Sequence, residues 1–240
     1  MEGNKINVDQ IQHIAIIMDG NRRWAKIREQ PPMFGHQNGC ETLLKIVKYA
    51  KRIGIKYMTV YAFSKENWGR TKQEVDFLMM LLKNYINQVL MKTREELENV
   101  QIKFTGNMEG VDEESKNMIY SVEKETEENK EFQLNICFSY SGRQEIVDAV
   151  KQIVLDVQKG NMSVDDIDEL MFKKYLYDPI SPYPDLIIRT AGEMRLSNFL
   201  LWQVGYSEFY STQKLWPDFS ENDLDEAIFN FNQRKRNNGK

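Results

Sequence analysis

The sequence contains few of the residues from which disulfide frameworks and metal clusters are built. Its 240 residues include only two cysteines, Cys40 and Cys137, and two histidines, His13 and His36. The cysteines stand far apart and outside any metal-type spacing, so we interpret both as reduced and structural. Two isolated histidines also exclude a histidine-rich metal site.

Long apolar runs are absent as well. The longest, such as Phe77 to Leu82, fall far short of the length that spans a bilayer. The first twelve residues are polar and contain no apolar segment, so we expect no secretory signal. Together with a mean hydropathy of −0.58, this predicts a globular protein of the cytoplasm.

The usual signals for nucleotides and nucleic acids are missing too. There is no Walker loop and no Gly-x-Gly-x-x-Gly fingerprint. A net charge of −4 argues against a broad nucleic-acid surface, and we predict no nucleic-acid partner. The basic residues nonetheless form two local groups, for which a solvated face is the alternative to a binding role. These groups are Arg22, Arg23, Lys26 and Arg28, and Arg234, Lys235 and Arg236.

The most informative stretch lies near the start of the chain. An apolar run of strand length, from Ile14, is followed at once by Asp19, Gly20, Asn21 and two arginines. This pattern predicts a buried strand whose carboxyl end carries polar groups, where open α/β sheets bind ligands. A carboxylate can hold a hard cation, and amide and guanidinium groups bind phosphate oxygens. The stretch therefore indicates a magnesium diphosphate site, although composition alone fits an Asp-Gly turn equally well.

Strand and helix patterns alternate along the rest of the chain. This order predicts a single α/β domain with a mainly parallel central sheet of about six strands flanked by helices. We expect a polar segment over 1–12, a catalytic domain over 13–233 and a basic tail over 234–240. The predicted strand over 57–63 also ends in polar residues, so we expect Ser64 to Arg70 at the same sheet edge as Asp19. The prolines in 29–33 predict a loop. The expected strands are 14–17, 57–63, 101–105, 133–139, 186–189 and 207–211, and the expected helices are 39–53, 71–91, 112–128, 144–157, 163–176 and 220–231.

Two of these helices carry wide apolar faces. Thr71 and Glu74 form a capping box at the start of the first, which is apolar nearly all round and must contact two apolar surfaces. A core contact combined with a dimer interface would satisfy this pattern. In the helix over 144–157, helical spacing predicts an inward face made of Ile146, Val147, Val150, Ile153 and Val154.

Several motifs with rare residues follow the first one in a fixed order. Together they resemble the cis-prenyltransferase family, the undecaprenyl diphosphate synthases and their relatives, from His13 to about Phe219. The motifs are Gly35 to Gly39, Phe63 to Arg70, Tyr140 to Arg143, Asp185 to Thr190, Arg195 to Gln203, Glu208 and Leu215 to Phe219.

The resemblance implies a reaction and its partners. An Mg²⁺-dependent transferase would condense isopentenyl diphosphate with an allylic diphosphate, farnesyl or geranyl, to give a cis-polyprenyl diphosphate of the undecaprenyl type for cell-wall lipid carriers. It also implies a homodimer and peripheral contact with the inner face of the plasma membrane through the lipid product. Two alternatives stay open: a specialised paralogue that makes a short or irregular product, and a non-catalytic partner subunit.

The resemblance further implies a role for each motif residue. Asp19 is the catalytic acid linked to the metal, and Glu208 is a second metal acid contributed across a homodimer interface. Ser64, Glu66 and Asn67 orient isopentenyl diphosphate and handle its departing proton, with Asn67 as a catalytic residue. The allylic diphosphate is expected to contact Gly20, Asn21, Arg22, Arg23, His36 and Arg70, and isopentenyl diphosphate to contact Arg189, Arg195 and Ser197. Trp24 and Trp68 complete the expected substrate-binding set, with Trp24 packing the base of the loop.

The chain also departs from the family pattern. Pro32 stands where the family usually has an arginine for the allylic diphosphate, and Met194 stands where bacterial members often have a histidine. Neighbouring Arg28 or Lys26 could compensate for the first change. The resemblance also implies a tunnel for the growing hydrocarbon, with the small Ala62 at its mouth. Its depth would be set by Leu134 and the helix over 75–90.

Overall fold

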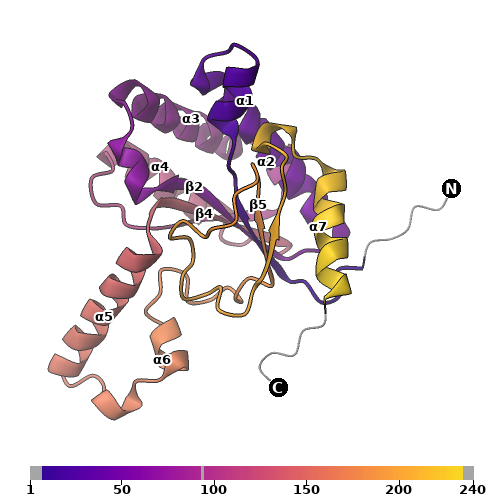
Figure 1. Cartoon of the computed structure of the whole chain (residues 1–240). Coiled ribbons are helices and arrows are strands. Elements are labelled where there is room, and N and C mark those ends of the chain that lie inside the picture. Colours follow the sequence, from indigo (N-terminus) through magenta and orange to yellow (C-terminus); the bar gives the residue numbers. More distant parts are fainter. Residues whose placement is uncertain (1–6, 93–94, 235–240) are drawn as a thin grey trace.

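A computed structural model describes residues 7–92 and 95–234, which form an α/β fold around one sheet. Its six strands are all parallel and lie in the order β3-β4-β2-β1-β5-β6 (Figure 1). The strands are β1 (His13–Ile17), β2 (Tyr57–Ser64), β3 (Val100–Thr105), β4 (Phe132–Tyr140), β5 (Leu186–Arg189) and β6 (Glu208–Ser211). The predicted fold class and all six predicted strands are confirmed.

Helices connect and cover the strands. They are α1 (Asn21–Ile27), α2 (Pro32–Ile53), α3 (Lys72–Leu90), α4 (Glu113–Thr126), α5 (Gly142–Gln158), α6 (Glu169–Lys173) and α7 (Glu221–Gln233). Short 3₁₀ turns lie at Lys65–Gly69, Glu95–Leu97, Val164–Asp166 and Trp216–Asp218. Within the described part of the chain, none of the helices combines the length and the apolarity that crossing a membrane requires.

Two helix predictions need correction, and one helix was missed. Helix α2 begins at Pro32, inside the predicted loop, because proline suits the first helical position, where its missing N–H is not needed. Helix α1 was not predicted. It begins after Gly20, whose φ of 107° is a left-handed conformation that glycine adopts without strain. The predicted helix over 163–176 is interrupted at the extended Ile167, so that only the short α6 remains beyond it.

The two faces of the sheet have different covers. Alternate strand residues point to opposite faces, so Ile14 and Ile16 pack in the core under α2, α4 and α7, whereas Ala15 and Ile17 face the other side. That second side is covered by the segment after β5, chiefly through Phe199. The carboxyl edge of the sheet is left open between these layers.

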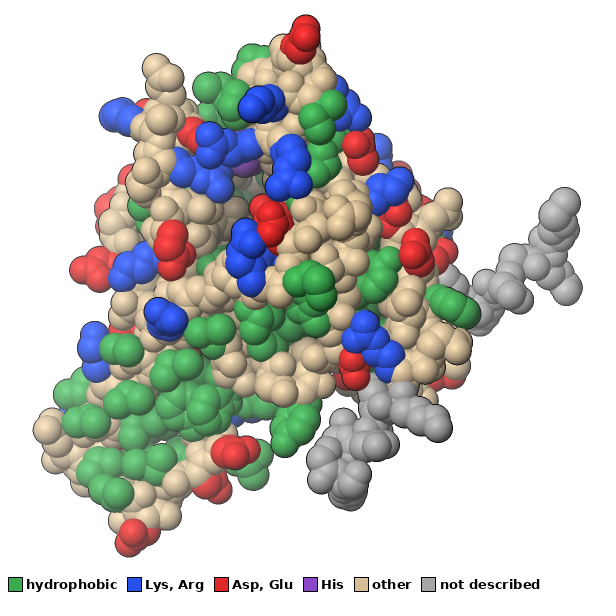
Figure 2. Space-filling view, in the orientation of Figure 1, with side chains coloured by type: hydrophobic (Ala, Val, Ile, Leu, Met, Phe, Trp, Pro, Cys, Tyr) green, Lys and Arg blue, Asp and Glu red, His purple; other side chains and the backbone are tan. Residues whose placement is uncertain are grey.

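The three valines of the predicted inward face of helix α5 point outward instead, whereas Ile146 and Ile153 pack inward as predicted. Val147, Val150 and Val154 are each 47% exposed, while Ala149 and Ile153 are buried, and only Ile153 of the predicted inward set is fully buried. Helices α5 and α6 extend away from the sheet (Figure 1). Their outer side is a continuous apolar surface in the space-filling view (Figure 2), made of Val147, Val150, Val154, Leu155, Val164, Ile167 and Leu170.

Candidate active site

A polar cavity of about 670 Å³ lies at the carboxyl edge of the sheet. The loops after β1, β2, β4 and β5 all contribute to its wall, as expected for an open α/β sheet. The prediction that separate motifs share one sheet edge is therefore confirmed. Predicted site residues in the wall are Asp19, Asn21, His36, Ser64, Glu66, Asn67, Arg70, Arg189 and Ser197.

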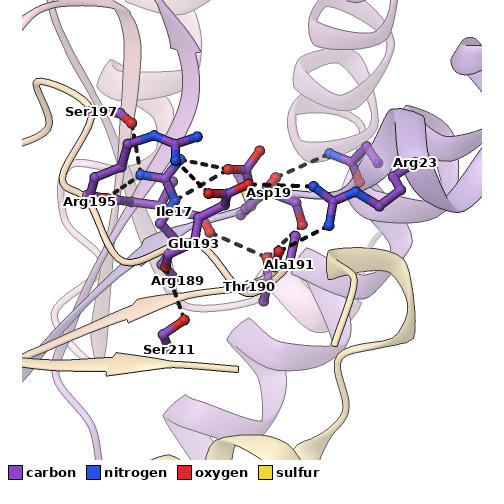
Figure 3. A network of polar contacts seen from close by, with 12 residues as sticks. Ile17, Asp19, Arg23, Arg189, Thr190, Ala191, Glu193, Arg195, Ser197 and Ser211 are labelled. Carbon is purple, nitrogen blue, oxygen red and sulfur yellow. Dashed lines mark hydrogen bonds and ion pairs between the residues drawn. The ribbon is translucent and has the colours of Figure 1, made fainter. Parts of the chain in front are cut away.

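An ion pair between Asp19 and Arg189 forms part of the cavity wall. Figure 3 shows the polar network around this pair. Arg189 Nη2 and Nε donate to Asp19 Oδ2 at 2.7 and 3.3 Å. Arg189 Nη1 also donates to Ser197 Oγ at 2.8 Å and to the backbone carbonyl of Arg195. Arg189 is only 3% exposed, and the Asp19 carboxylate offsets the cost of burying its guanidinium.

A glutamate that the sequence analysis overlooked joins the two expected phosphate subsites. Glu193 Oε2 accepts a hydrogen bond from Arg195 Nη1 at 2.5 Å, and Glu193 Oε1 lies 3.5 Å from Arg23 Nη2. Arg23 Nη1 also donates to the carbonyl of Ala191 at 3.1 Å. These contacts lower the pKa of Glu193, chiefly through the hydrogen bond and charge of Arg195. One carboxylate therefore holds an arginine from each subsite in place (Figure 3).

A second carboxylate, that of Glu74, lies among two arginines and His36. Glu74 is 7% exposed, and its Oε1 accepts from Arg70 Nη1 at 2.9 Å and lies 3.4 Å from His36 Nε2 and 3.8 Å from Arg22 Nε. Burial, followed by the charge of Arg70, lowers the pKa of His36 below its ordinary value. The predicted capping box is half correct: Thr71 Oγ1 accepts from the Glu74 N–H, but the Glu74 carboxylate turns to the cations instead.

Both predicted tryptophans of the site have packing roles outside the cavity wall. Trp24 is buried, and its Nε1 donates to Asp218 Oδ1 at 2.6 Å. Arg28 stacks on the Trp24 ring at 3.9 Å and donates to the same carboxylate, so it is not free to compensate for Pro32. Trp68 Nε1 donates to Ser139 Oγ at 3.0 Å and braces the 3₁₀ turn after β2.

The second predicted metal ligand lies elsewhere in the chain. Glu208 begins β6 and is paired with Leu186, whereas Arg189 is paired with Ser211 three residues further on. Glu208 is therefore about 10 Å along the strand from the edge that carries Asp19. It accepts a hydrogen bond from Arg234 Nη1 at 2.5 Å. A metal role for Glu208 requires a second chain and stays a prediction. The rest of the tail, 235–240, lies outside the described residues.

The polar cavity leads into an apolar one of about 170 Å³. Met18, Asn21, His36, Ala62 and Leu78 line both, so the two cavities meet at this neck. The predicted tunnel residues Ala62 and Leu134 and the inner face of α3 all lie in the apolar wall. The two cavities together define a site for a ligand with an anionic head and a hydrocarbon tail.

The polar cavity also offers a donor suited to Mg²⁺. Asp19 presents a carboxylate that is 41% exposed, and only its Oδ2 is engaged by Arg189. Mg²⁺ is commonly held by one or two carboxylates together with substrate phosphates and water. The described residues contain no group of three or more His, Cys, Asp or Glu side chains placed to hold a metal. The cavity thus fits a magnesium ion that arrives with a diphosphate.

Comparisons with known proteins agree with this geometry. A family model, Prenyltransf, described as undecaprenyl diphosphate synthase, matches residues 17–239. An isoprenyl transferase of Fusobacterium nucleatum is 49% identical over 95% of each chain. A ditrans,polycis-undecaprenyl-diphosphate synthase of Micrococcus luteus, specific for (2E,6E)-farnesyl diphosphate, is 42% identical over 100% of this chain and 96% of that one.

A similar solved structure also belongs to an enzyme that makes a prenyl diphosphate. Lavandulyl diphosphate synthase from Lavandula x intermedia, in complex with dimethylallyl diphosphate, has a TM-score of 0.92 and 37% identity, covering 98% of this chain and 100% of that one. The fold and site thus define a prenyl-transferring class of enzyme. The chain belongs to the undecaprenyl diphosphate synthase family of isoprenyl transferases.

Proposed function

We propose that this protein condenses isopentenyl diphosphate with an allylic diphosphate, farnesyl or geranyl, to give a cis-polyprenyl diphosphate of the undecaprenyl type. The observation that carries the proposal is the shared neck between the polar and apolar cavities. A diphosphate bound among Asn21, His36 and Arg70 places its hydrocarbon against Ala62 and Leu78, at the entrance of the apolar wall. The family relationship supports the same chemistry.

The main role of the residues in the polar cavity is to stabilise the negative charge of the diphosphate groups. As the allylic C–O bond breaks, negative charge gathers on the leaving diphosphate, and the arginines stabilise it in a partly dry cavity. Arg23 and Arg195, held by Glu193, are placed to exchange that carboxylate for phosphate oxygens. Glu66 and Asn67, in the turn after β2, face the same cavity. The Glu66 carboxylate is placed to receive the proton that isopentenyl diphosphate loses, and Asn67 to orient that substrate through its amide group.

Mg²⁺ is the proposed cofactor. It would supply Lewis-acid polarisation of the phosphate oxygens when bound. Asp19 is the residue that would hold it, because its Oδ1 faces the cavity without a hydrogen-bond partner among the described residues. Arg189, through Oδ2, fixes the orientation of that carboxylate.

The proposal is tested by following labelled isopentenyl diphosphate into product, with and without Mg²⁺, using geranyl and farnesyl diphosphates as primers. We expect magnesium-dependent elongation by the purified chain. Asp19→Ala is expected to lower turnover by about 100-fold or more with an unchanged circular dichroism spectrum. Inactivity of the native chain with every primer would overturn the proposal and favour a partner-subunit role. A fully active Asp19→Ala variant would overturn the metal assignment alone.

A short product is the second candidate, and two observations favour it. The apolar cavity measures about 170 Å³, whereas about 150 Å³ is enough for one benzene molecule, so a long chain requires α3 to move outward. The similar plant structure is a lavandulyl diphosphate synthase. Sizing the product by chromatography separates the candidates, because a ladder of long chains excludes the short product. If the tunnel sets the length, Ala62→Phe should shift the distribution to shorter chains.

A homodimer is proposed through the apolar surface of α5 and α6. Exposed aliphatic side chains in a continuous patch are typical of an interface in soluble proteins. A second copy of the same chain would also be the source of a Glu208 that reaches Asp19. Contact with a membrane through the lipid product, at the inner face of the plasma membrane, is a further proposal. Flotation of the product-loaded protein with vesicles would test it.

A further inference from the structure

Asn198 connects three loops at the carboxyl edge of the sheet. Its Nδ2 donates to Glu66 Oε1 at 3.0 Å, in the turn after β2, and to Ser141 Oγ at 2.7 Å, at the start of α5. Its Oδ1 accepts from the backbone N–H of Arg143 at 2.9 Å. One amide side chain thus uses both its donor and its acceptor to hold the loops that follow β2 and β4.

The backbone of Asn198 is part of the same connection. Its carbonyl accepts from the Gly142 N–H at 2.8 Å, and an added Cβ at Gly142 would lie 2.9 Å from that oxygen. Asn198 itself has a φ of 67°, in the left-handed region where asparagine is several-fold enriched over most other residues. The backbone conformation and the side-chain contacts at position 198 therefore both favour asparagine.

The contact with Glu66 has an electrostatic consequence. Burial raises the pKa of Glu66, but hydrogen bonds from its own backbone, Asn198 and Ser64 outweigh burial and lower it. The carboxylate is thereby kept ionised and fixed in the wall of the polar cavity. The charge of Lys65, from the same turn, also acts on Glu66. The other charged or titratable groups in the same cavity wall are Tyr61 from β2, Arg70 after the turn, His36 from α2, Arg143 from α5, and the Asp19–Arg189 pair.

We propose that Asn198 is a positioning residue that holds the Glu66 carboxylate and the loops after β2 and β4 in place for isopentenyl diphosphate. The proposal rests on the proposed function, because it assigns Asn198 to one subsite of that reaction. Asn198 acts through Glu66 and Ser141. The allylic subsite is braced separately, by Glu74 and by Asp218, and does not depend on it.

Asn198→Asp is the most direct test. The change is nearly isosteric, keeps an acceptor for the Arg143 N–H, and replaces the donor to Glu66 by a second carboxylate. Because a neighbouring like charge raises a carboxyl pKa, the acidic limb of the pH profile of kcat/KM for isopentenyl diphosphate should move up by about one pH unit. Asn198→Gly keeps the left-handed backbone but removes the amide, and should give a smaller shift in the same direction.

Asn107→Asp is the matched control. Asn107 Nδ2 donates to Asp148 Oδ2 at 3.4 Å outside the cavity wall, so the same chemical change should leave the pH profile unmoved. Binding of farnesyl diphosphate alone, followed by intrinsic fluorescence, should stay within about twofold of the native value in both Asn198 variants. Unmoved acidic limbs in these variants, or an equal shift in Asn107→Asp, would overturn the proposal. Absence of native activity would instead count against the proposed function.

Discussion

Helices α3 and α5 have similar sequence features but different surroundings in the fold. Each begins after a hydroxyl N-cap, Thr71 or Ser141, and each carries a buried glutamate in its first turn, Glu74 or Glu145. Each also has a wide apolar face. In α3 this face lines the apolar cavity, whereas in α5 the outer valines have no cover within the described chain. A helical pattern thus reveals that an apolar face exists, but not what lies against it.

Matched aspartate substitutions should separate the two faces most strongly. Leu81 is buried in the cavity wall of α3, so Leu81→Asp places an unpaired charge in apolar surroundings and should cost several kcal/mol of unfolding free energy. Val150 on α5 is half exposed, and Val150→Asp should change the monomer's unfolding free energy by no more than about 0.5 kcal/mol. Urea titrations of both variants at low protein concentration measure the difference.

Val150→Asp also tests the proposed cover of α5. If a second copy lies against this surface, the native chain should sediment as a dimer and the variant as a monomer of native fold. A native chain that is monomeric over the whole micromolar range would contradict the proposed interface. Equal destabilisation by Leu81→Asp and Val150→Asp would show that the apolar faces of α3 and α5 are buried to the same extent in the monomer.

The contrast between the helices explains where sequence reasoning succeeded. The strands and the shared sheet edge followed from apolar runs ending in polar residues, because parallel strands place these ends together. The outward turn of the α5 valines could not be derived, since the inward Glu145 depends on Gln203, which lies 58 positions away in the chain. The link from Glu193 to Arg23 is equally non-local, because the two residues lie 170 positions apart. Partners that lie so far apart in the chain leave no pattern in the local sequence from which the contact could be predicted.

Replacing each buried glutamate by glutamine should change the free energy of unfolding in opposite directions. Glu74→Gln should destabilise the protein and should have the larger effect. Glu74→Gln leaves Arg70, His36 and Arg22 without a carboxylate and should cost about 1.5–3 kcal/mol, nearer the lower value because Arg70 is partly exposed. Asp76→Asn, which breaks the exposed pair with Lys72 on the same helix, is the control and should cost under about 0.5 kcal/mol. Equal costs measured by urea unfolding would show that burial adds nothing to the Glu74 cluster.

Glu145→Gln should have the smallest effect, and the opposite sign. The Glu145 carboxylate is surrounded by neutral donors, Tyr140 Oη at 2.5 Å, the Tyr177 N–H at 3.0 Å and Gln203 Nε2 at 3.0 Å. Burial is the main cause that raises its pKa above the ordinary 4.5. A raised pKa means that the folded state binds the proton more tightly than the unfolded state. The stability from this group is therefore fully present below pH 4.5 and is lost as pH rises through the folded pKa.

The variant has no such titration, so its stability relative to the native protein should increase with pH above 4.5 and then level off. Gln203 can accommodate the new amide, because its buried Oε1 has no hydrogen-bond partner in the described structure and can turn to accept from it. Urea unfolding of both proteins at several pH values between 4 and 8 measures this difference. The unfolding free energy of the variant minus that of the native protein could instead stay constant or fall as pH rises. That result would show that the Glu145 carboxylate is as well stabilised in α5 as the Glu74 carboxylate is in α3, and the two helices would not differ electrostatically.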